Sequence, residues 1–126
     1  MTTPDPIARL EAADKGSREL DLEVHKAAEL CDPSAWYSEH FDQLEWNEHH
    51  PEAPGGADEF CTAPLPHYTT NFDAALTLVR GDLWWRVEGR GKAFTAQIGK
   101  SRQFHAGAAG PALAICIAAF RAREAV

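Results

Sequence analysis

The sequence predicts an α+β fold in which helices pack on both faces of a small, mainly antiparallel β-sheet (an αβα sandwich). Two observations carry this prediction. Apolar and polar residues alternate over residues 83–98, which is the period of a strand, and a glycine-containing turn at 89–92 divides them into an antiparallel hairpin. Residues 111–123 form a nearly unbroken apolar helix that begins at Pro111, a residue favoured at the first helical position. The hairpin is the expected centre of the fold, and the helix is its main apolar cover.

The beginning of the chain predicts two short helices. Asp5 can accept the free amide groups of a first helical turn, and this helix is expected to end before Gly16. Ser17 is a favoured N-cap for the second helix, in which apolar residues recur at helical spacing as far as Cys31. These helices supply further apolar faces for the sheet.

The middle of the chain is the least regular part. Residues 34–46 carry aromatic side chains at loosely helical spacing, which indicates a short helix. The prolines and glycines of residues 51–66 break that pattern and predict irregular, extended chain. A further helix is expected to be capped at Thr70, and residues 101–105 fit a third strand.

Charge is distributed unevenly along the 126 residues, whose formal net charge is −7. Residues 1–79 hold 16 acidic and 4 basic side chains, whereas residues 80–126 hold 3 acidic and 8 basic ones. Residues 32–59 contain eight carboxylates and neither lysine nor arginine. This balance argues against general affinity for nucleic-acid backbones, which requires a basic face, and favours a partner with a basic surface.

Other compositional features bear on the cellular location. The longest apolar run, residues 111–120, is half of what a membrane crossing needs, and the first residues do not match a secretory signal. The three cysteines are an odd and widely scattered set, as expected for reduced thiols in a cytoplasm. We therefore expect a cytoplasmic protein without membrane contact.

The acidic segment is the first candidate site. Its carboxylates repel one another and alternate with large aromatic side chains, a combination suited to electrostatic steering with aromatic anchors. Such a surface could occupy a basic nucleic-acid channel, although a polar insertion that maintains solubility is the simpler alternative. The candidate partner-binding residues are Trp36, Tyr37, Glu39, Asp42, Glu45, Trp46 and Glu48.

Two other groups offer different chemistry. A basic group near the hairpin suggests an anion site for a nucleotide or phosphate, with solvated surface charge as the alternative; it consists of Arg86, Arg90, Lys92 and Arg102. A second group could bind Zn²⁺ or Mn²⁺, with solvated loop histidines as the alternative; it consists of Glu39 and His40 with Glu48, His49 and His50. No nucleophile motif is present, so we expect no catalytic residue, no cofactor and no required metal.

Several segments resemble the phage ABA-sandwich domain family. They read DPIARLEAA (5–13), GSRELD (16–21), HYTTNFDAALTLV (67–79), WRVE (85–88), KAFTAQ (92–97) and PALAICIAAFRARE (111–124). The resemblance implies a small phage or prophage protein with helices on both faces of an antiparallel sheet, and it carries no catalytic residues over. It leaves residues 32–66 outside the match. We therefore expect a single domain over residues 1–126 with an acidic insertion at 32–66.

Together these observations predict a non-enzymatic phage accessory protein that acts in the cytoplasm of the bacterial host. It would bind and block a host macromolecule with a basic surface, such as a CRISPR effector or another nucleic-acid-guided nuclease. One alternative is a small-ligand binder that sequesters a nucleotide messenger, and a weaker one is a metal-dependent hydrolase. A homodimer is compatible with the sequence.

Overall fold

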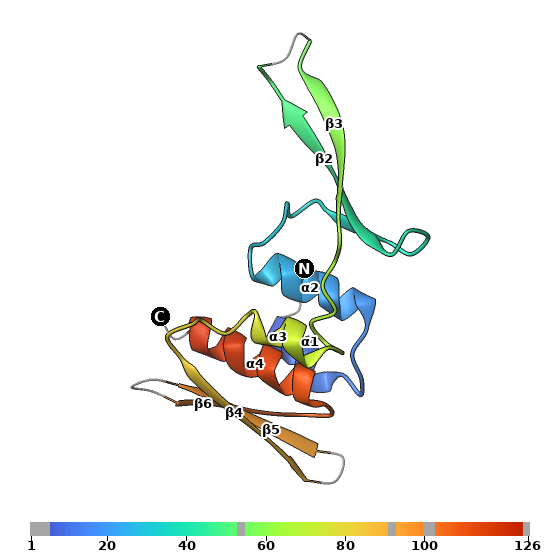
Figure 1. The fold of residues 1–126 in the computed structure, drawn as a ribbon. Helices are drawn as coiled ribbons and strands as arrows, with labels where there is room; N and C mark the ends of the chain where they lie inside the picture. Colours follow the sequence, from blue (N-terminus) through green and yellow to red (C-terminus); the bar gives the residue numbers. More distant parts are fainter. Residues whose placement is uncertain (1–5, 53–54, 91–92, 100–102, 125–126) are drawn as a thin grey trace.

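The computed structural model describes residues 6–52, 55–90, 93–99 and 103–124, and these form an α+β fold (Figure 1). Two separate antiparallel sheets, each of three strands, are combined with helices. The elements in chain order are α1 (Pro6–Ala12), α2 (Arg18–Ala27), β1 (Trp36–Ser38), β2 (Gln43–His50), β3 (Ala57–Ala63), α3 (Phe72–Leu76), β4 (Trp84–Arg90), β5 (Ala93–Gly99), β6 (Gln103–Ala108) and α4 (Pro111–Glu124).

The C-terminal half contains the main core. The predicted hairpin is confirmed as β4 and β5, with Val87 opposite Ala96, and β6 adds the third strand on the other side of β5. The last helix is confirmed as α4, which lies along this sheet and is buried over most of its length. Cys116 is a core residue, as expected, and burial raises the pKa of its thiol to about 12.

The two-sided covering of the sheet is not confirmed. In Figure 1 all four helices lie on one side of the β4–β5–β6 sheet, with α4 directly against it. Because neighbouring strand residues point to opposite faces, Ala96 and Ile98 are buried beneath α4 while Trp84 and Arg86 are exposed on the other face. The described part of the chain therefore shows a sheet with one open, largely polar face.

A buried carboxylate joins the N-terminal helices to the rest of the protein. Ser17 caps α2 as predicted, and its Oγ accepts a hydrogen bond of 3.1 Å from the backbone N–H of Leu20. One turn further on, Asp21 is fully buried and accepts hydrogen bonds from the backbone N–H (2.8 Å) and the hydroxyl (2.7 Å) of Thr69. Arg18 supplies the opposite charge at 2.8 Å. A buried carboxylate needs such partners, since an unpaired one would cost several kcal/mol.

The same region leaves no space for a side chain at Gly16. A Cβ atom there would lie 2.4 Å from the backbone oxygen of Thr69 and 2.6 Å from its Oγ1. We expect Gly16→Ala to lower the free energy of unfolding by about 1–3 kcal/mol, because the backbone at Thr69 has to move. Urea denaturation measures this change. Gly81→Ala is the matched control, since a Cβ at Gly81 meets nothing within 4 Å; an equal loss in both variants would contradict the explanation.

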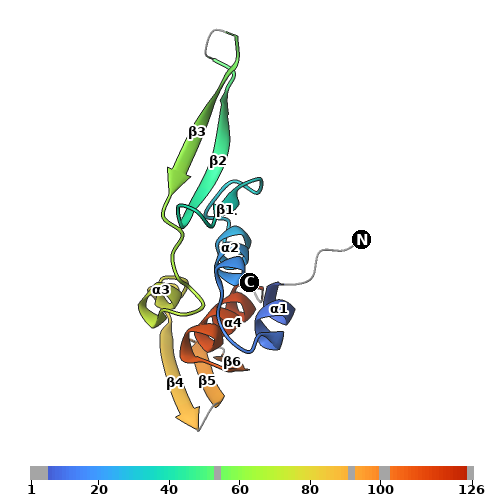
Figure 2. The same cartoon turned by 90° about the vertical axis from the view of Figure 1, so that its right-hand side faces the viewer.

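Residues 36–63 form a second, elongated sheet that we call the arm. It projects from α2, on the opposite side of the molecule from the β4–β5–β6 sheet (Figures 1 and 2). β2 and β3 pair along seven residue positions, whereas β1 pairs only with Gln43–Glu45 at the start of β2. Gly55 and Gly56, both at positive φ, lie in the connection between β2 and β3, where the sequence predicts a break.

The predicted helix over 34–46 is wrong, because this segment contains β1, a turn and the start of β2. The aromatic spacing resembles a helix only because the turn between the strands places Phe41 and Leu44 at helix-like intervals from Tyr37. Residues 57–63, expected to be irregular, form β3. Polar side chains occupy both faces of the outer arm, so the alternation that identifies a half-buried strand is missing.

A small apolar cluster lies where the arm meets α2. It consists of buried Ala35, Leu44 and Leu65, with partly buried Leu22 and Trp46 packed against it. This cluster is distinct from the main core around α4. The expectation of one domain with an insertion at 32–66 stays a prediction. Within the described ranges, no helix has both the length and the apolar character needed to cross a bilayer.

Candidate functional site: the acidic arm

The register of β2 and β3 sorts the arm's side chains onto two faces. Directly opposite residues in an antiparallel pair share a face, and successive residues alternate between faces. The face that we call the aromatic face carries Trp36, Asn47, His49, Asp58 and Phe60. The face that we call the carboxylate face carries Glu48, His50, Glu59 and Cys61.

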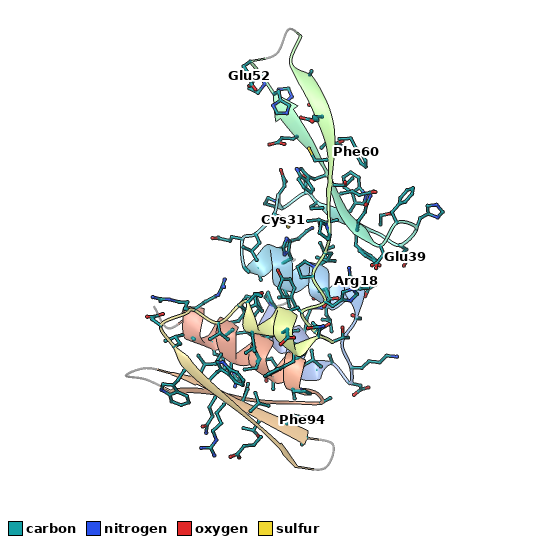
Figure 3. The ribbon with its side chains drawn as sticks, viewed as in Figure 1. Arg18, Cys31, Glu39, Glu52, Phe60 and Phe94 are labelled. Atoms are coloured by element: carbon teal, nitrogen blue, oxygen red, sulfur yellow. The ribbon has the colours of Figure 1, made fainter. Side chains whose placement is uncertain are left out.

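The aromatic face exposes large apolar side chains. Trp36 is 39% exposed and Phe60 58%, and their ring centroids lie 6.3 Å apart (Figure 3 labels Phe60). Phe41, in the turn between β1 and β2, is 65% exposed. Exposed aromatic groups of this size on a projecting element are typical of contact surfaces, where such residues contribute most of the binding energy.

Glu45 differs from its expected role as a surface residue. It is only 8% exposed, and its two carboxylate oxygens accept hydrogen bonds from Trp36 Nε1 (2.9 Å) and Gln43 Nε2 (2.8 Å). A carboxylate that is engaged in this way is not available to a partner. We therefore correct its assignment from a partner-binding residue to one that positions the Trp36 ring.

Three other predicted residues hold the arm to α2. The Tyr37 hydroxyl donates a 2.6 Å hydrogen bond to Asp42, which also pairs with Arg18 at 3.1 Å. These contacts, the hydrogen bond from Tyr37 foremost, hold the pKa of Asp42 below its usual value. Arg18 also lies over the Tyr37 ring, 5.1 Å from its centroid, and Trp46 packs in the small apolar cluster. Tyr37, Asp42 and Trp46 therefore belong to the junction.

The remaining acidic residues of the arm point into solvent. The exposed carboxylates are Glu39, Glu48, Glu52, Asp58 and Glu59. Their ion-pair partners, where they have any, are His49 and His50, which lie in the arm itself. By contrast, Arg86 of the β4–β5–β6 sheet pairs with Glu88 beside it, at the other end of the molecule (Figure 1). The negative potential of the arm is therefore not neutralised by that arginine.

The predicted metal group is divided by the structure. His49 pairs with Asp58 (2.7 Å) on the aromatic face, whereas His50 pairs with Glu59 (2.9 Å) on the carboxylate face. Glu39 and His40 lie in the turn between β1 and β2, at the opposite end of the arm. The five residues therefore do not form one site.

A different group of metal-binding side chains meets on the carboxylate face. Ligand atoms of Glu48, Glu59 and Cys61 all lie within 4.8 Å of one another. The Cys61 thiol donates to Glu48 at 3.4 Å; burial, followed by this hydrogen bond, raises its pKa. Hydrogen bonds to Glu59 and then Glu52 raise the pKa of His50. Sequence reasoning missed Glu59 and Cys61 because only the pairing of β3 with β2 brings them to Glu48.

The predicted anion-binding group is only partly visible. Arg86 is exposed but forms an ion pair with Glu88, and the backbone of Arg90 ends β4. Lys92 and Arg102 lie outside the described residues. The anion site accordingly stays a prediction.

A groove of about 870 Å³ lies between α1, α2 and the base of the arm. Leu22 and Tyr37 contribute apolar surface, while Arg9, Glu23 and Lys26 contribute charges of both signs. Arg9 and Glu23 form an ion pair with each other. This mixed lining gives no preference for an anionic messenger.

Comparison with known proteins yields no match: no family model fits the chain, and neither a curated protein nor a solved structure is significantly similar to it. The resemblance to phage ABA-sandwich domains therefore stays an expectation. Function has to be argued from the arm's geometry.

Proposed function

We propose that this chain is a non-enzymatic phage or prophage accessory protein whose arm binds a basic surface of a host macromolecule and blocks it. The observation that carries the proposal is the combination of five exposed carboxylates with the exposed Trp36–Phe60 pair on one projecting hairpin. The target that fits best is a nucleic-acid-guided nuclease, such as a CRISPR effector, in the cytoplasm of the bacterial host. Direct binding of nucleic acid is disfavoured by the arm's charge.

The dimensions and chemistry of the arm support this target. β2 has eight residues and therefore spans about 25 Å, a length suited to a nucleic-acid channel. Carboxylates steer the arm toward a cationic channel, and the aromatic pair supplies apolar contact once it is seated there. The hydrogen bond from Trp36 to Glu45 fixes the indole before binding, which reduces the entropy lost on association.

The phage resemblance supports the proposed origin, because it covers the helices and the hairpin of the body and leaves out residues 32–66. The arm is then the part particular to this protein, as expected for the segment that selects a partner. The two-sided αβα sandwich belongs to the same proposal. It would require a helix from a partner or a second copy to cover the open face of the β4–β5–β6 sheet.

The experiment measures DNA cleavage by a panel of purified RNA-guided nucleases in the presence of this protein. We expect inhibition of at least one nuclease, and we expect the triple variant Glu39→Gln, Glu52→Gln, Asp58→Asn to inhibit about tenfold less, because three steering charges are lost. The matched control is Asp14→Asn, Glu19→Gln, Asp73→Asn, which changes the net charge equally at exposed positions outside the arm. This control should inhibit like the unmodified protein.

Three results would contradict the proposal. Inhibition of no nuclease in the panel would exclude this class of target. Equal weakening by both triple variants would assign the effect to net charge and not to the arm. Inhibition that persists unchanged when salt is raised from about 50 to about 300 mM would exclude an electrostatic mechanism, since exposed charges are screened over this range.

A further inference from the structure

The carboxylate face places two negative charges directly across from each other. Glu48 and Glu59 occupy opposite positions of the β2–β3 register, both exposed and both on the same side of the sheet. Like charges in this arrangement destabilise a strand pair. A cation held between them would reverse the sign of that interaction.

The neighbouring side chains supply the other ligands that a metal ion needs. His50 precedes the turn on the same face as Glu48, and its Nε2 lies 2.9 Å from Glu59 Oε2. Cys61 is two residues from Glu59 on the same face, and its Sγ lies 3.4 Å from Glu48 Oε2. One imidazole, one thiol and two carboxylates therefore surround a single point on the hairpin, and this mixed set distinguishes it from a simple acidic cluster.

We propose that the carboxylate face binds one Zn²⁺ ion through Cys61 Sγ, His50 Nε2 and one oxygen each of Glu48 and Glu59. The thiol proton that now points to Glu48 is released to solvent when the sulfur–zinc bond forms, so the thiolate becomes the ligand.

The observed spacings agree with a tetrahedral zinc site. Zinc lies about 2.3 Å from sulfur and about 2.0–2.2 Å from nitrogen and oxygen, so neighbouring ligand atoms in a tetrahedron are about 3.3–3.6 Å apart. The sulfur–oxygen distance of 3.4 Å matches this value, and the nitrogen–oxygen distance of 2.9 Å needs only a small increase. The Glu48, Glu59 and Cys61 ligand atoms, all within 4.8 Å of one another, require side-chain adjustment alone.

The surroundings of His50 also fit a metal ligand. Its Nδ1 lies 3.2 Å from Glu52 Oε1, which leaves Nε2 directed toward Glu59. A carboxylate on the second ring nitrogen is the usual partner of a zinc-bound histidine, because it fixes the ring and increases its basicity. Thiolate with imidazole favours zinc over magnesium or calcium, which prefer oxygen ligands alone.

A site with four protein ligands is closed and therefore structural. The ion would link β2 to β3 near the tip of the arm and hold the hairpin in one register. It lies on the face opposite Trp36 and Phe60, so binding of zinc does not depend on the partner proposed above.

The test uses the full chain purified without a histidine tag and treated with a chelator. Calorimetry with Zn²⁺ is expected to give one ion per chain, and Co²⁺ is expected to give the near-ultraviolet thiolate-to-cobalt absorption band. Cys61→Ser should abolish that band, and His50→Gln should weaken Zn²⁺ binding by at least about a hundredfold, more than the loss of an outer hydrogen-bond partner costs. Zinc should also slow amide hydrogen exchange in β2 and β3.

The chain offers matched controls for both changes. His49→Gln alters the neighbouring histidine on the other face, and Cys31→Ser alters a partly buried thiol in the apolar cluster. Both variants should bind Zn²⁺ as the unmodified protein does. Circular dichroism of every variant establishes that the fold is retained. Absence of Zn²⁺ binding at micromolar concentrations, or an equal loss in the control variants, would overturn the proposal.

Discussion

Asp21→Ala is expected to lower the free energy of unfolding by about 3–5 kcal/mol, the largest effect of any single substitution considered for this protein. The change leaves the Arg18 guanidinium without its closest opposite charge. It also leaves the buried N–H and hydroxyl of Thr69 without their acceptor. Arg18 itself donates to the backbone oxygen of Leu65 at 2.7 Å, so the connection between the body and the arm is weakened as well. Urea denaturation followed by circular dichroism measures the loss.

Glu19→Ala is the control for this substitution, because Glu19 is exposed on the same helix and should change stability by less than about 0.5 kcal/mol. A double-mutant cycle with Thr69→Val separates the hydrogen bonds from the rest of the effect. If the two substitutions prove additive, Asp21 and Thr69 do not stabilise the fold through each other, and the explanation fails.

Leu44→Ala is the second substitution with a large expected effect, about 2–5 kcal/mol, because Leu44 is 1% exposed and lies at the centre of the small apolar cluster. The loss is expected to be local. The arm meets the body through this cluster, whereas α4 and the β4–β5–β6 sheet have their own core. Amide hydrogen exchange should therefore accelerate in β2 and β3 and remain slow in α4.

Leu30→Ala is the matched control, since Leu30 is 55% exposed and should leave the exchange rates unchanged. Equal acceleration in α4 and in the arm would show that the two cores unfold as one unit. That outcome would contradict a separately stabilised arm.

The elements that the sequence predicts well are those in which one apolar face is repeated at a clear period. The alternation around Trp85 and Val87 identifies β4, and the uninterrupted apolar stretch after Pro111 identifies α4. Ser17 is recognised as an N-cap because its role depends only on the next turn of chain. Such signals are local, and local chemistry is sufficient to define them.

The arm lacks a local signal of this kind. Its outer strands are polar on both faces, so neither their period nor their pairing is visible in the sequence. The buried position of Glu45 depends on contacts with Trp36 across the β1–β2 pair. The meeting of Cys61 with Glu48 depends on a register between residues 13 positions apart. The acidic character of the site is predictable from composition, whereas the division of its residues between two faces requires the fold.

The short length of β1 has a consequence for the behaviour of the protein in concentrated solution. Because β1 covers only the first three residues of β2, and β3 is the last strand of its sheet, the outer arm presents unpaired backbone donors and acceptors along its length. Edges of this kind invite additional strands from other molecules and lead to aggregation. The carboxylates on both sides of the hairpin oppose such stacking by mutual repulsion. The charge that attracts a cationic target thus also keeps identical molecules apart.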